Sequence, residues 1–96
     1  MGNYDDAYAH LINYYTFQKE FYPPISLQRA LIHDKIGNLM LKKKIFDRAE
    51  KHFDKSLDIK LKILGEVSFY TVTSYLSLGE VQFIYGKYKE ALDFFL

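Results

Sequence analysis

The stretch KYKEALDFF, residues 87–95, is the third occurrence of one pattern in this chain. NYDDAYAHL, residues 3–11, and IFDRAEKHF, residues 45–53, carry the same order of aromatic, small and large apolar residues. The matched positions are Tyr4, Phe46 and Tyr88, then Ala7, Ala49 and Ala91, then Leu11, Phe53 and Phe95. Each set is spaced by 42 residues (4 to 46 to 88) without a gap. Self-similarity at a fixed period of this size indicates a repeat protein.

The apolar spacing predicts two helices in each unit. The same offset pairs Gly37 with Gly79 and Ser26 with Ser68. Ser26 is a candidate N-cap, and a glycine such as Gly65 or Gly86 is typical of a helix end. Apolar residues recur at helical spacing throughout, and nothing is typical of a strand. The helices expected from these signals cover 4–21, 26–43, 46–64, 68–85 and 88 onward.

The unit boundaries follow from the same offset. We expect one helical repeat segment over residues 1–96, with a partial unit over about 1–24, a full unit over 25–66 and a partial unit over 67–96. The chain starts and stops within a unit, so the sequence alone predicts a fragment of a longer array, cut out of phase with its repeat.

The pattern resembles the tetratricopeptide repeat. Its succession of a large residue, aliphatic-Gly, turn Gly, aromatic, Ala and aromatic is matched by Tyr75, Leu78, Gly79, Gly86, Tyr88, Ala91 and Phe95. The middle unit departs from it, because Lys44 replaces the turn glycine and His33 the large aromatic residue. The resemblance implies an all-α, antiparallel helix-pair solenoid of about two and a half repeats. The long period of 42 residues is similar to the kinesin-light-chain form.

Composition narrows the class of partner and the location. The net charge is +1, which gives no electrostatic reason to expect nucleic acid or an anionic membrane. No apolar run is long enough to span a bilayer, and no signal peptide is present. The absence of cysteine fits a reducing compartment. We therefore expect a cytoplasmic protein, with a cytoskeletal or ciliary location as an alternative.

No motif for catalysis or cofactor binding is present. The sequence lacks the glycine-rich nucleotide motifs and the G-x-S-x-G nucleophile motif. Asp6 and His10 are four residues apart, but one carboxylate and one imidazole are too few ligands for a metal site. The sequence therefore predicts no enzyme, no cofactor and no metal.

The resemblance implies a module that binds a peptide or a helix of a protein partner, as in an adaptor or scaffold. In such solenoids the first helix of each unit lines the concave groove. The expected partner-binding residues are Leu31, Asp34, Lys35, Asn38, Leu41, Lys42, Thr73, Leu76, Ser77, Glu80, Phe83 and Ile84. Chaperone-binding relatives hold a terminal carboxylate with Lys and Asn. Asn38 matches the Asn, but Asp34 stands at the Lys position and disfavours that clamp.

A purely architectural role is the alternative. In it the solenoid is a spacer or assembly element of a large complex and contacts partners through edges, loops or ends. The apolar terminal helices leave self-association as a further alternative.

Overall fold

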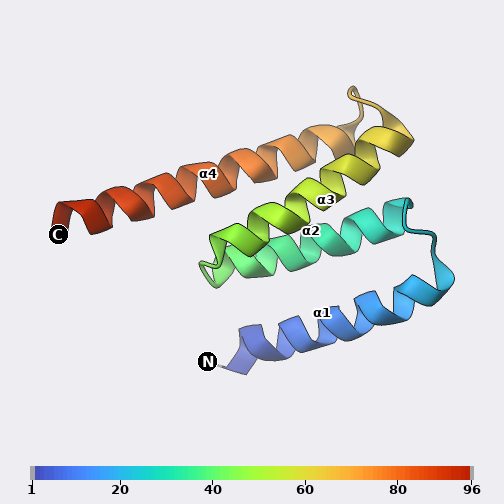
Figure 1. Cartoon of the computed structure of the whole chain (residues 1–96), viewed down its shortest axis with the longest axis horizontal. Helices are drawn as coiled ribbons and strands as arrows, with labels where there is room; N and C mark the ends of the chain where they lie inside the picture. Colours follow the sequence, from blue (N-terminus) through green and yellow to red (C-terminus); the bar gives the residue numbers. More distant parts are fainter. Residues whose placement is uncertain (1, 96) are drawn as a thin grey trace.

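The chain folds into four successive antiparallel helices. The computed structural model describes residues 2–95, apart from the side chains of residues 2, 91, 94 and 95. The helices are α1 (Gly2–Phe21), α2 (Leu27–Lys42), α3 (Phe46–Leu64) and α4 (Phe69–Phe95). Each packs on the next in a thin layer of 48 × 35 × 15 Å (Figure 1). The predicted all-α helical repeat fold is confirmed.

The core lies where α2 meets α3, because small residues let these two helices approach. Ala49 of α3 is fully buried, as its repeat position predicts. The ring of Phe53, also fully buried, lies against Gly37 of α2, where an added Cβ would be 2.8 Å from a ring carbon. Ile32, Ile36 and Met40 of α2 and Val81 of α4 belong to the same cluster. Burial of one such large apolar side chain stabilises the fold by about 1.5–3 kcal/mol.

The predicted helix signals at the α2 and α3 ends are present. The hydroxyl of Ser26 accepts a hydrogen bond from the backbone N–H of Arg29, so Ser26 caps α2. Gly65 follows α3 with a φ of 77°, a conformation that favours glycine. Lys44, in the turn between α2 and α3, has a φ of 63° although it is not glycine. Residue 44, which the 42-residue register matches to Gly86, therefore does lie in a turn.

The prediction of a fifth helix from residue 88 is wrong. α4 continues through Gly86 to Phe95, for a length of 27 residues. An isolated glycine inside a helix costs only about 1 kcal/mol relative to alanine, so Gly86 does not force a break. The straight course also keeps Tyr88 near Phe46 of α3, with ring centroids 5.9 Å apart.

A buried lysine joins three of the helices. Lys60 of α3 donates to Asp34 of α2 at 2.6 Å and to the hydroxyl of Ser74 of α4 at 2.7 Å. This contact fixes α2 and α4 relative to α3. In the described part of the chain, none of the helices has the length and apolarity needed to cross a bilayer.

Candidate partner-binding groove

The predicted residues of α2 form an exposed stripe on one side of that helix. Leu31, Lys35, Asn38 and Lys42 follow at intervals of four, three and four residues, which places them on one helical face. All four are exposed to solvent. Lys35, Asn38 and Lys42 border one hollow between α1 and α2, and Leu31 and Lys35 border a second.

The wider part of the groove lies near the start of α1 and the end of α2. It is a hollow of about 430 Å³ between the two helices. Its walls are Ala7, His10 and Leu11 from α1 and Lys35, Asn38, Leu39 and Lys42 from α2. The floor is thus apolar, while the α2 rim carries two lysines and an amide.

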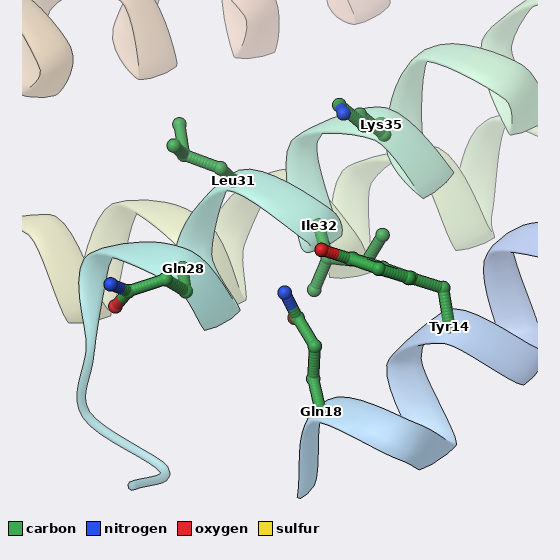
Figure 2. A pocket seen from close by; sticks show the side chains of 6 residues that line it. All are labelled: Tyr14, Gln18, Gln28, Leu31, Ile32 and Lys35. Atoms are coloured by element: carbon green, nitrogen blue, oxygen red, sulfur yellow. The ribbon is translucent and has the colours of Figure 1, made fainter. Parts of the chain in front are cut away.

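The narrower part lies near the end of α1 and has a volume of about 170 Å³. It is lined by Tyr14 and Gln18 from α1 and by Gln28, Leu31, Ile32 and Lys35 from α2. Figure 2 shows Tyr14 and Gln18 reaching from α1 toward Ile32, while Leu31 and Lys35 project from α2 on the side away from α1. Lys35 borders both hollows, so they are neighbours along the two helices, and together they are called the α1–α2 groove.

Gln18 is a buried polar residue in the α1 wall of this groove. Its Oε1 atom has no hydrogen-bond partner among the described residues. A buried polar atom without a partner costs about 1–3 kcal/mol, and most such atoms in proteins are satisfied. The oxygen has almost no accessible surface, so a ligand in the groove does not reach it in this structure.

The charge of the groove is positive. Lys35 and Lys42 lie on its rim, and none of the residues that line its two hollows is acidic. Asp34, a predicted site residue on the next face of α2, is half-buried and engaged by Lys60. Its charge is therefore compensated within the fold and is directed at α3.

The remaining predicted residues lie elsewhere. Leu41 is half-buried and packs against the core cluster. The α4 members line neither hollow of the α1–α2 groove. Of these, Leu76, Glu80 and Phe83 are exposed, and Thr73, Ser77 and Ile84 are half-buried. The structure thus divides the predicted set between the groove and a separate surface on α4.

Sequence reasoning missed the α1 wall of the groove. Ala7, Leu11, Tyr14 and Gln18 have the same spacing as Leu31, Lys35, Asn38 and Lys42, so both walls are single helical faces. The 42-residue register matches α1 to the second helix of a unit. The groove residues were expected on the first helices only. The matching spacing of the two stripes is the signal that could have identified the wall.

Two histidines meet beneath the groove. The Nδ1 atoms of His33 on α2 and His52 on α3 are 3.0 Å apart, so one ring donates to the other. Burial, with the nearby His52 and Lys55, lowers the pKa of His33 to about 4. Burial also lowers the pKa of His52. In the described residues no third His, Cys, Asp or Glu joins them to form a metal-binding group.

A comparison with known families identifies the repeat. The family model of the tetratricopeptide repeat matches residues 27–96, from the first residue of α2 onward and over more than half of the chain. Neither the curated proteins nor the solved structures include a match to the chain.

Proposed function

Since the chain belongs to the tetratricopeptide repeat family, whose members are in general protein-interaction modules, we propose that its α1–α2 groove binds an extended segment of a protein partner. The groove has the features of a peptide site. It consists of two neighbouring hollows, it has an apolar floor, and it carries a few polar groups on its rim. Within the predicted site, this proposal rests on Leu31, Lys35, Asn38 and Lys42.

The apolar floor bordered by two lysines and an amide is the observation that carries the proposal. An extended peptide places successive side chains on opposite sides. One apolar side chain can therefore lie on the floor at Leu11 and Leu39, while polar neighbours meet the rim.

The rim supplies the selectivity. Lys35 and Lys42 favour acidic side chains in the bound segment, since opposite charges across an interface steer and fix it. Asn38 lies between them and can both donate and accept a hydrogen bond. The apolar floor at Leu11 and Leu39 takes an aliphatic or aromatic side chain. The proposed ligand is therefore an extended segment that alternates acidic and apolar residues.

A selection from a random library of displayed peptides tests the proposal. Peptides enriched on the chain are expected to be acidic, and one of them then serves as the probe. Lys35→Glu is expected to raise its Kd about tenfold or more, because one reversed charge contact is worth at least about 1.4 kcal/mol here. Asn38→Ala removes the exposed amide of the rim, and is expected to raise the Kd about 2- to 10-fold.

Lys51→Glu is the matched control. Lys51 is exposed on α3, outside the groove. Its replacement by glutamate changes the net charge by the same amount as Lys35→Glu. If Lys51→Glu weakens the probe as much as Lys35→Glu, the effect is one of overall charge and the groove proposal fails.

The architectural alternative is supported by a different observation. Large apolar side chains are exposed on α4, with Leu76 at 68% and Phe83 at 65%, and on α1, with Phe21 at 62%. Exposed apolar patches of this kind mark contact surfaces. A crosslinking map of the chain with its natural partner separates the two roles. Contacts confined to these side chains favour assembly, and contacts along the α1–α2 groove favour peptide binding.

A further inference from the structure

One aromatic ring at the contact between α1 and α2 has two cationic side chains beside it. The Nζ atom of Lys19 lies 4.8 Å from the ring centroid of Tyr15, and the guanidinium carbon of Arg29 lies 5.3 Å from the same centroid. Lys19 is exposed on α1, whereas Arg29, on α2, is only 9% exposed. Two positive charges therefore meet at one half-buried tyrosine.

The buried charge of Arg29 has only neutral partners. Its guanidinium donates to the backbone oxygen of Tyr22 at 3.2 Å, and the Tyr15 ring provides a cation–π contact. In the part of the chain that the structure describes, the ion pairs join other residues, namely Lys43 with Asp5, Lys60 with Asp34 and Lys62 with Asp58. Since a buried arginine is normally paired with an anion, Arg29 is a charge without its counter-ion.

The histidine pair extends this positive region to α3. The ring of His33 packs on Tyr15, with centroids 5.1 Å apart, and meets His52 through the Nδ1 contact described above. Burial is the first cause that lowers the pKa of either ring. The charges that lower these pKa values further are all positive, namely His52, Lys55, Arg29 and Lys19 at His33, and Lys55 and Arg48 at His52.

We call this set of side chains from three helices the Tyr15 cluster. It consists of Tyr15 and Lys19 on α1, Arg29 and His33 on α2, and Arg48, His52 and Lys55 on α3. Three of its cations, Lys19, Arg48 and Lys55, are exposed, and His52 is half-buried, so a ligand can contact them. Arg29 adds its charge from beneath. None of these residues lines either hollow of the α1–α2 groove.

We propose that the Tyr15 cluster binds a doubly charged oxyanion of the phosphate type. The two lysines and two arginines of the cluster carry permanent charges, and none of them is in an ion pair among the described residues. A phosphate monoester brings about two negative charges and three strong acceptor oxygens. A carboxylate brings one charge and two oxygens. The number of unpaired cations therefore favours the phosphate.

The histidine pair provides a readout of such a ligand. In the contact between the rings one Nδ1–H donates to the other Nδ1. When His52 gains a proton, its Nδ1–H donates to neutral His33, and its Nε2–H is left for the oxyanion. An anion beside the ring favours the protonated form, so bound phosphate should raise the pKa of His52. A cluster with a purely structural role would leave this pKa unchanged.

Titration of the histidine ring signals by NMR tests the proposal. Inorganic phosphate is the probe, and chloride at the same ionic strength is the reference. Phosphate is expected to raise the pKa of His52 toward its ordinary value. His10 borders the α1–α2 groove, so it reports phosphate that binds there instead, and its pKa is expected to stay the same.

Two exposed lysines of the cluster are the residues to change. Lys19→Gln and Lys55→Gln are each expected to raise the Kd for phosphate about two- to fivefold, because each removes one exposed charge contact. Both side chains are exposed, so the fold does not depend on them. Lys89→Gln is the matched control, because Lys89 is exposed on α4, outside the cluster, and its loss changes the net charge equally.

Two short peptides identify the source of the phosphate. One carries a phosphoserine, and the other carries an aspartate in its place. If the phosphoserine peptide binds more tightly than inorganic phosphate, the ligand is a phosphorylated segment of a protein. If the two bind equally, the ligand is a free phosphate compound. Either result supports the phosphate site.

Four results would overturn the proposal. The first is a pKa of His52 that is the same in phosphate and in chloride. The second is a rise of the pKa at His10 alone, which would place the anion in the α1–α2 groove. The third is a Kd that Lys89→Gln raises as much as Lys19→Gln. The fourth is an aspartate peptide that binds as tightly as the phosphoserine peptide, since a single carboxylate is then sufficient.

Discussion

Lys60 and Asp34 form an ion pair of 2.6 Å in which the lysine is far more buried than the carboxylate, with side chains 1% and 20% exposed. Among the described residues, the Lys60 ammonium has one further hydrogen bond, to the hydroxyl of Ser74. A buried charge that loses its partner costs far more than an exposed one. The two partners of this pair should therefore differ in what their removal costs.

Asp34→Asn is expected to lower the free energy of unfolding by about 3 kcal/mol, because it leaves the Lys60 ammonium buried without a counter-charge. Lys60→Met should cost less, since methionine fills the buried volume of the lysine stem and the side chain left without its partner, that of Asp34, is 20% rather than 1% exposed. Urea unfolding midpoints of the two variants measure the difference. Lys62→Met is the control, because Lys62 pairs with Asp58 at the surface. This substitution should lower the free energy of unfolding by at most about 1 kcal/mol. An Asp34→Asn midpoint equal to that control would contradict a structural role for the pair.

Ala49→Leu tests the repeat register at its tightest position. Ala49 is fully buried between α2 and α3, so the larger side chain should overpack the core and cost about 1–3 kcal/mol. Lys51→Ala, two residues further along α3 and exposed, should change stability by less than about 0.5 kcal/mol. Urea midpoints again provide the comparison. Equal midpoints would mean that the assigned helix faces are wrong.

The histidine pair predicts a loss of stability in mild acid. The pKa of His33 is lowered from its ordinary value of 6.5 to about 4 in the folded chain. Between these two values the unfolded chain binds more protons than the folded chain, so the free energy of unfolding falls as the pH drops. Above pH 6.5 this penalty is absent, and by pH 4 it reaches up to about 3 kcal/mol.

Unfolding by urea at several pH values between 4 and 7 measures this dependence. His33→Gln should flatten it, because the glutamine side chain does not titrate in this range. His10→Gln is the matched control, since His10 is exposed on α1 and apart from the pair. A His33→Gln variant that loses as much stability in acid as the unchanged chain would assign the effect to other groups.

Much of the fold could be predicted from the repeat. The register among residues 3–11, 45–53 and 87–95 predicted the α2–α3 hairpin, the burial of Ala49 and Phe53 and the cap at Ser26, since these depend on local pattern and on short-range packing. The course of α4 could not be predicted in the same way. Whether Gly86 turns or stays helical depends on the balance between a continued helix and the packing of the segment that follows it.

The candidate site was predicted in part. The α2 stripe from Leu31 to Lys42 was expected from the repeat resemblance, which assigns groove residues to the first helix of each unit. The wall that faces it depends on how α1 is rotated about its axis, and packing with α2 determines that rotation. The ion pair of Asp34 with Lys60 and the contact of His33 with His52 likewise arise only when separate helices are brought together.

A map of backbone amide shifts on titration with the selected acidic peptide tests the groove most directly. The groove account predicts that the largest changes fall on two helical stripes. These are Ala7, Leu11, Tyr14 and Gln18 on α1, and Leu31, Lys35, Asn38 and Lys42 on α2. Changes that cluster instead on α4, around Leu76 and Phe83, or only at the chain ends, would contradict it.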